Sequence, residues 1–207
     1  MRTEFAQQVF ETRLGVRHLF DAVEDFTVGK IEWSVLHVEI SFQVQFPMVF
    51  SNVPINIPKD ANIIFGQSHF IKTVEDIYEA IVNTNPTIKF GVAFNEASGP
   101  CLTRADGNDQ EMIQSAIENL QSVGCGHTFL VVLKGGFPIN VLGRIKDVPE
   151  VANIFCATAN PVEVVIATTG LGRGVMGIID GFKPRGLETP EDVVERKEFL
   201  RKIGYKR

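Results

Sequence analysis

The segment TFLVVL, residues 128–133, is the strongest indication of the fold class, because five of its six residues are apolar and no polar residue alternates with them. A strand with one wet face alternates in polarity, whereas a strand covered on both faces reads as a nearly continuous apolar run. The segment NIIFG, residues 62–66, has the same character. Both runs therefore predict a sheet that is covered on both faces.

Amphipathic segments alternate with these strands along the chain. The spacing of apolar residues predicts helices over 73–82, with Thr73 as N-cap, and from an N-cap at Asn108 or Asp109 to Gly124. Further helices are expected near 141–145 and from Thr189-Pro190 to residue 204. Additional strands are expected at 89–94, 152–158, 162–168 and 175–179, the last two as a hairpin pair. We therefore expect an α/β layered domain with a mixed, largely buried sheet and helices packed on it.

The first 47 residues differ from the remainder of the chain. Apolar residues recur at helical spacing from Val9 to Val23, and residues 38–46 then alternate strictly between apolar and polar or small side chains until Pro47. This pattern predicts a helix followed by a strand. We interpret residues 1–47 as an N-terminal extension of unknown role and residues 48–207 as the domain that carries the function.

The composition excludes several classes of partner. The chain has 20 Lys and Arg against 25 Asp and Glu, a net charge of -5, which argues against binding to nucleic acid or an anionic membrane. Its three cysteines have no paired spacing, which indicates a reducing cytoplasm and no disulfide or zinc framework. No apolar run reaches the ~18 residues that span a bilayer, and the N-terminus has no export pattern. These observations favour a small molecule or another protein as the binding partner.

The common nucleotide-binding motifs are absent or out of context. Gly172, Gly174 and Gly177 match GxGxxG, but the β-branched residues that follow predict a strand where a dinucleotide site needs a helix. No Gly-Lys-Ser or Gly-Lys-Thr occurs, so a P-loop is excluded, and the protein-kinase signatures are missing. The glycine-rich turn with Arg173 could form an anion nest or be a plain turn with an exposed arginine.

Two histidines lie in loops suited to an anion. His69 stands between a strand and the helix expected from Thr73, where Ser68 and Lys72 supply further donors. His127 is flanked by Gly124 and Gly126, which would let a ligand approach closely. A neutral imidazole can attack phosphorus near pH 7. The alternative for each is a histidine that is hydrogen-bonded to loop backbone.

Two more polar residues follow predicted strands. Glu96 ends the strand at 89–94 and could bind a ribose hydroxyl or act as a base, or be a solvated loop acid. Asn160 precedes Pro161 and could contact a base edge or simply form a turn.

Seven blocks, in one unbroken order over roughly residues 52–207, resemble the adenosine-specific kinase family. They are GQSHFIKTVEDIYEA, KFGVAFNEASG, GCGHTFLVVL, FPINVLGRIKDVPEV, ATANPVEVV, GRGVMGIIDG and RKEFLRKIGYK. The resemblance implies a compact α/β domain that forms a homotrimer, binds adenosine or AMP and transfers phosphoryl groups with a phosphorylated histidine. The extension has no counterpart in this pattern.

Carried over by position, the resemblance makes His69 and His127 the catalytic candidates, without deciding which is phosphorylated. The binding candidates are Ser68, Lys72, Glu96, Asn160, Gly172, Arg173 and Gly174. ATP is the expected phosphate donor, and no sequence motif supports a bound Mg²⁺. The expected function is an adenosine-phosphorylating transferase; the alternatives are an adenosine or AMP sensor without turnover and a trimeric scaffold.

Overall fold

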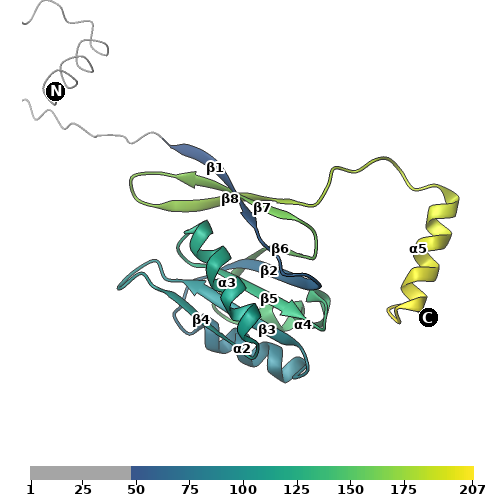
Figure 1. Cartoon of the computed structure of the whole chain (residues 1–207), viewed down its shortest axis with the longest axis horizontal. Coiled ribbons are helices and arrows are strands. Elements are labelled where there is room, and N and C mark those ends of the chain that lie inside the picture. Colours follow the sequence, from purple (N-terminus) through teal and green to yellow (C-terminus); the bar gives the residue numbers. More distant parts are fainter. Residues whose placement is uncertain (1–47) are drawn as a thin grey trace, which may run out of the picture. The chain divides into compact units, whose positions relative to one another are not determined.

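A computed structural model describes residues 48–207 (Figure 1); the helix and strand expected within residues 1–47 lie outside this range. Twelve elements follow one another: β1 (Val49–Ile55), β2 (Ala61–Ser68), α2 (Thr73–Thr84), β3 (Lys89–Asn95), β4 (Thr103–Gly107), α3 (Gln110–Val123), β5 (Thr128–Lys134), α4 (Pro138–Lys146), β6 (Val151–Thr158), β7 (Val162–Thr168), β8 (Arg173–Asp180) and α5 (Pro190–Lys202).

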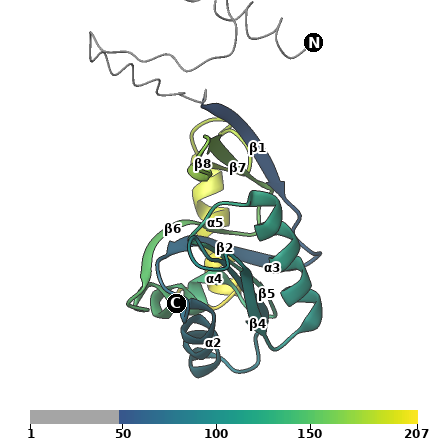
Figure 2. The ribbon, with the colours of Figure 1, turned by 90° about the vertical axis from the view of Figure 1, so that its left-hand side faces the viewer.

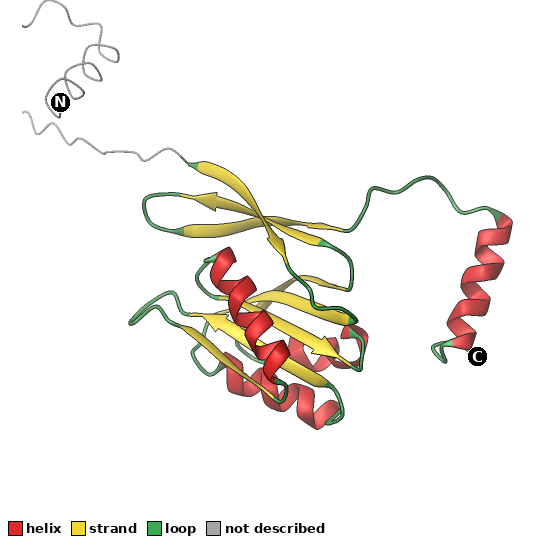
Figure 3. Ribbon diagram, viewed as in Figure 1, coloured by secondary structure: helices red, strands yellow, loops and turns green. Residues whose placement is uncertain are grey.

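The strands form two sheets, which Figure 3 shows with the helices in red. One has five strands in the order β4-β3-β5-β2-β6, and the other has three in the order β1-β7-β8. The expected α/β class is confirmed, as is the hairpin pairing of β7 with β8. The expected mixed sheet is not found: every strand pair among residues 48–207 is antiparallel.

The connections explain why a mixed sheet was expected. Helix α2 joins β2 to β3, α3 joins β4 to β5, and α4 joins β5 to β6, and in each case the two strands run in the same direction. A third strand lies between the members of every such pair, antiparallel to both. The predicted alternation of strands and helices is therefore found, although no two parallel strands are neighbours. One consequence is that β2 and β3 end at the edge where β5 and β6 begin.

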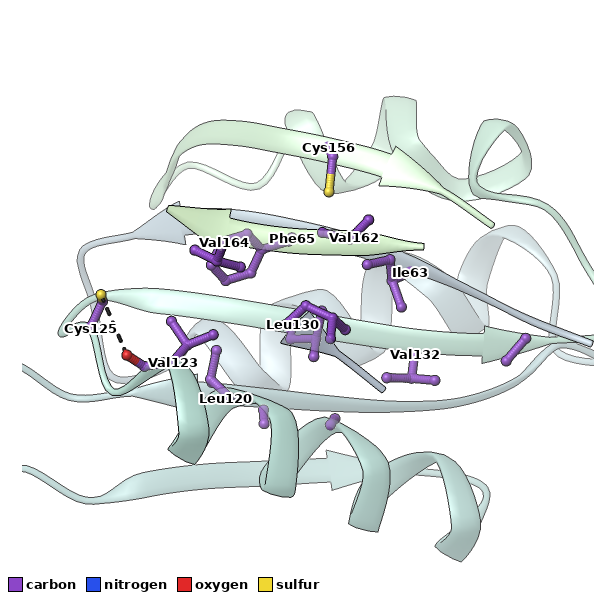
Figure 4. Packing of buried hydrophobic residues seen from close by; sticks show 14 of the residues in the cluster. Ile63, Phe65, Leu120, Val123, Cys125, Leu130, Val132, Cys156, Val162 and Val164 are labelled. Carbon is purple, nitrogen blue, oxygen red and sulfur yellow. Dashed lines mark hydrogen bonds between the residues drawn. The ribbon is translucent and has the colours of Figure 1, made fainter. Parts of the chain in front are cut away.

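The five-stranded sheet is covered on both faces, as the apolar strands predicted. On one face, Leu120 and Val123 of α3 and Val164 of β7 pack against Phe65 and Leu130 (Figure 4). On the other face α2 and α4 supply a second cluster; its fully buried members include Ile77, Ile81, Val141, Ile145, Phe90, Phe129 and Val131. Figure 2 shows α2 and α3 at different sides of this sheet. Strand β5 contributes to both clusters, which is why its apolar residues run without interruption.

Local signals placed most helix ends correctly. The Asp109 carboxylate accepts hydrogen bonds from the backbone N–H groups of Glu111 and Met112, and Gly124 ends α3 with φ 59°. Thr189 caps α5 in a capping box with Asp192. Thr73 is an exception: the N-cap of α2 is Lys72, with Thr73 as first helical residue. The Thr73 hydroxyl bonds instead to the Ser68 hydroxyl at 2.6 Å, which draws it away from the helix N–H groups.

Two strands had no sequence signal of their own. Strand β1 contains Pro54, yet its edge position beside β7 tolerates a residue without an N–H group. Strand β4 carries the polar residues Thr103, Arg104 and Asp106 and pairs with β3 at the other sheet's edge. Between residues 48 and 207, no helix is long and apolar enough to cross a membrane.

Candidate functional site

The candidate site lies along the edge of the five-stranded sheet where β2 and β3 end and β5 and β6 begin; we call this the site edge. Backbone hydrogen bonds link neighbouring strands there. The Ser68 N–H donates to the His127 carbonyl at 2.9 Å, and the His127 N–H donates to the Asn95 carbonyl at 2.8 Å. On the other side of β2, the His69 N–H donates to the Glu150 carbonyl at 3.2 Å. The two histidines therefore lie at the ends of adjacent strands.

The His69 ring is held in one orientation by a main-chain contact. Its Nδ1 lies 2.9 Å from the carbonyl oxygen of Glu150. Because a carbonyl oxygen only accepts hydrogen bonds, Nδ1 must carry the proton when the ring is neutral. The lone pair then resides on Nε2, and the residue is exposed. This arrangement leaves Nε2 as an available nucleophile.

Ser68 and Lys72 are engaged with the protein itself. The Ser68 hydroxyl is fully buried and bonds to the Thr73 hydroxyl and, at 3.1 Å, to the Glu150 carbonyl. The Lys72 ammonium pairs with Asp76 and, at 3.0 Å, with Glu150. These hydrogen bonds, first with Asp76 and then with Glu150, raise the pKa of Lys72 above its usual value. Ser68 fastens the loop, while the Lys72 side chain is 45% exposed and can still reach a ligand.

Glu150 is the residue at this edge that sequence reasoning missed. Its side chain is only 3% exposed, and its carbonyl holds His69 and Ser68 while one carboxylate oxygen holds Lys72. Glu150 precedes β6, whose Val151 pairs with Ser68. The sequence signal was an acid placed directly before a strand, but only the antiparallel register of β2 and β6 brings it to His69.

His127 has an unusual backbone. Its φ of 59° lies in the left-handed region, which costs a residue other than glycine free energy and is concentrated at functional sites. Its ring stacks on Phe94, with centroids 6.1 Å apart and planes inclined by 14°. Phe94 is buried, whereas His127 is partly exposed. The site edge thus presents a partly exposed imidazole ring that lies nearly parallel to a buried phenyl ring.

The contacts of Glu96 indicate a structural role and not that of a free general base. Its carboxylate accepts from the Leu102 N–H at 2.9 Å and from Arg104 Nε at 2.8 Å. The Leu102 hydrogen bond and then Arg104 lower the pKa of Glu96 below its usual value. A Cβ on Gly126 would lie 2.7 Å from Ala97 Cβ, so only glycine lets the His127 loop pack this closely beside Glu96.

The glycine-rich turn reaches the same region from the three-stranded sheet. Arg173 Nη1 donates to the Ser122 carbonyl at 3.1 Å, in the last turn of α3, where a positive charge is favourable. Burial raises the pKa of the nearby Cys125 thiol, and Arg173 opposes this effect. Gly172 and Gly174 face open space, and strand β8, not a helix, follows the turn. The strand predicted after this turn, where a dinucleotide fingerprint would need a helix, is confirmed.

Asn160 is not brought to the site edge. It lies beyond the other end of β6, and its side-chain amide donates to Asp180 at 3.0 Å. Seven strand steps separate Val151 from Thr158, roughly 23 Å at the usual rise per residue. In this structure Asn160 therefore lies at the β6–β7 turn, away from the site edge.

In the part of the chain that the structure describes, the histidines belong neither to a metal-ligating cluster nor to the lining of a hollow beside α2. Within the described residues, no group of three or more His, Cys, Asp and Glu side chains could hold a metal ion. A hollow of about 320 Å³ lies beside α2 and the end of α4, lined by residues that include Asp76, Glu79, Arg144 and Asp147. Its acidic lining does not suit a phosphate group.

A family model and a solved structure match this chain. Residues 53–206 match the family model described as adenosine-specific kinase. A solved structure, described as the crystal structure of the PH1918 protein from Pyrococcus horikoshii OT3, is 42% identical with a TM-score of 0.75. The match covers 78% of this chain and 99% of that one. No curated protein matches. The chain belongs to the adenosine-specific kinase family.

Proposed function

We propose that the protein transfers a phosphoryl group to adenosine through a phosphohistidine at His69. The observation that supports this most directly is the contact between His69 Nδ1 and the Glu150 carbonyl, because it leaves the lone pair on Nε2 of an exposed residue. In the first half of the reaction, Nε2 would attack the terminal phosphorus of ATP, and ADP would leave. In the second half, a ribose hydroxyl of adenosine would take the phosphoryl group and give AMP.

Three of the remaining candidates would have separate roles in this reaction. Lys72 would neutralise charge on the phosphoryl group, since its ammonium lies at the surface beside His69. The His127 ring, backed by Phe94, would stack against adenine. Arg173 is one cation near the glycine-flanked loop and would bind a further phosphate. Any Mg²⁺ would be bound mainly by the phosphates of the nucleotide.

Incubation with ATP labelled in the γ-phosphate tests this proposal. We expect acid-labile, alkali-stable label on the wild-type protein, AMP formation on addition of adenosine, and loss of both in His69→Ala. His127→Asn is the control, because asparagine tolerates the left-handed backbone; it should keep the label and bind adenosine more weakly. NMR should place phosphorus on Nε2. Label on His127, or AMP formation by His69→Ala at the wild-type rate, would overturn the assignment.

A second candidate function is an adenosine or AMP sensor without turnover. It is favoured by the engagement of both Lys72 and Ser68 in bonds within the protein, which leaves fewer groups free for phosphate. Calorimetry that shows adenosine binding, together with no AMP after long incubation with ATP, would support it.

We also propose a homotrimer in a reducing cytoplasm. Exposed apolar side chains on β1, β8 and α5 support the trimer. The free thiols of Cys101, Cys125 and Cys156 support the reducing compartment.

A further inference from the structure

One carboxylate oxygen at the site edge is unsatisfied. Among the described residues, Glu150 Oε1 is the one buried side-chain nitrogen or oxygen without a hydrogen-bond partner. Leaving a buried acceptor unpaired destabilises the folded chain, and more so when the acceptor is charged. This oxygen is therefore available to a donor that the described residues do not themselves supply.

The contacts of Glu150 link its unpaired oxygen to the residues that we propose for phosphoryl transfer. The carbonyl of the same residue orients His69 through Nδ1 at 2.9 Å, and its other carboxylate oxygen holds Lys72 at 3.0 Å. Two of the groups assigned to phosphoryl transfer are therefore bound by this single residue. A carboxylate repels phosphate oxygens, so the ligand atom facing Oε1 must be a hydrogen-bond donor.

We propose that Glu150 Oε1 binds the hydroxyl group of the nucleoside and takes its proton as that hydroxyl attacks the phosphoryl group on His69. This inference rests on the proposed function. In this step the hydroxyl oxygen bonds to phosphorus, its proton passes to Oε1, and the bond between phosphorus and Nε2 breaks. The electron pair of that bond stays on Nε2, which restores the neutral ring with its proton on Nδ1.

Access to Oε1 requires the loop that precedes α2 to rearrange. The side chain of Glu150 is 3% exposed, whereas His69, Phe70, Ile71 and Lys72 are all exposed. A phosphoryl group on His69 would attract the Lys72 ammonium away from Glu150. The carboxylate would then lose its ion-pair partner and become a stronger proton acceptor when the phosphoryl group is in place.

The two half-reactions can be measured separately. Wild type, Glu150→Gln and Glu150→Asp are phosphorylated on histidine with phosphoramidate, which avoids any dependence on ATP, and are then mixed with adenosine. Glutamine keeps the shape and the bond to Lys72 but cannot take a proton at neutral pH. We expect Glu150→Gln to be phosphorylated like wild type and to transfer at least 100-fold more slowly. Glu150→Asp should be intermediate.

Asp76→Asn is the matched control, because it removes a carboxylate from the same lysine without touching Oε1. Its transfer rate should stay within about threefold of wild type. Transfer by Glu150→Gln at the wild-type rate would overturn the role of Glu150 as proton acceptor. Loss of histidine phosphorylation in that variant would also overturn it, because Glu150 would then act only by orienting His69. If phosphorylated wild type does not react with adenosine, the proposed function itself fails.

Discussion

Glu96 shows how the contacts of a single side chain determine its role. Both of its carboxylate oxygens are occupied, one by the Leu102 N–H and one by Arg104, and these contacts lower its pKa. Its stabilising effect is therefore fully present above the ordinary pKa of a glutamate and is lost as the pH falls through the lowered value. We expect the urea midpoint of Glu96→Gln to lie below that of wild type at pH 7, and the difference to disappear in acid.

The exposed Glu118, whose carboxylate accepts from the Gln114 side-chain amide, provides the control for this series. Glu118→Gln should follow the wild-type midpoint at every pH. If the difference between Glu96→Gln and wild type persisted unchanged into acid, the carboxylate charge would not be what holds the loop.

Elements were predictable wherever the signal is local. A few consecutive residues determine each helix end that was predicted correctly. These ends are the N-cap of α3 at Asp109, its C-terminus at Gly124 and the capping box of α5 at Thr189. Strand β4 could not be predicted, because its polar residues form a strand only by pairing with β3. Thr73 was assigned the wrong role because its partner, Ser68, is a contact that only the folded loop creates.

Packing between elements gives a sharper prediction at Gly91 of β3. A Cβ built there would lie 2.2 Å from the backbone nitrogen of Ile113 in α3, so α3 would have to move. We expect Gly91→Ala to lower the free energy of unfolding by about 3 kcal/mol. Gly143, within α4, has no atom within 4 Å of the same position, and Gly143→Ala should raise it by about 1 kcal/mol. Urea unfolding at one fixed protein concentration compares the two.

At the scale of the whole molecule, the site edge is the feature that sequence alone could not supply. His69, Glu96 and His127 were candidates from their residue types, yet their placement along one edge depends on a strand inserted within each β-α-β unit. The same alternation removes Asn160 from the group and adds Glu150. The sequence therefore allowed candidate residues to be chosen by their side-chain chemistry. Which of them lie close together could be determined only from the order of the strands in the sheet.

The apolar surface of the domain leads to the last prediction. Phe50 of β1, Met176 of β8 and Phe182 are exposed, and α5 has no buried residue although Val194 and Phe199 are apolar. An apolar surface of this kind is typical of a protein interface. We expect the chain to sediment at three times 22.9 kDa at micromolar concentration. Phe199→Ser should shift it toward the monomer, whereas Lys197→Ser, on the same helix, should not. A wild-type chain that sediments at 22.9 kDa over the same range would contradict the trimer and leave α5 without a partner.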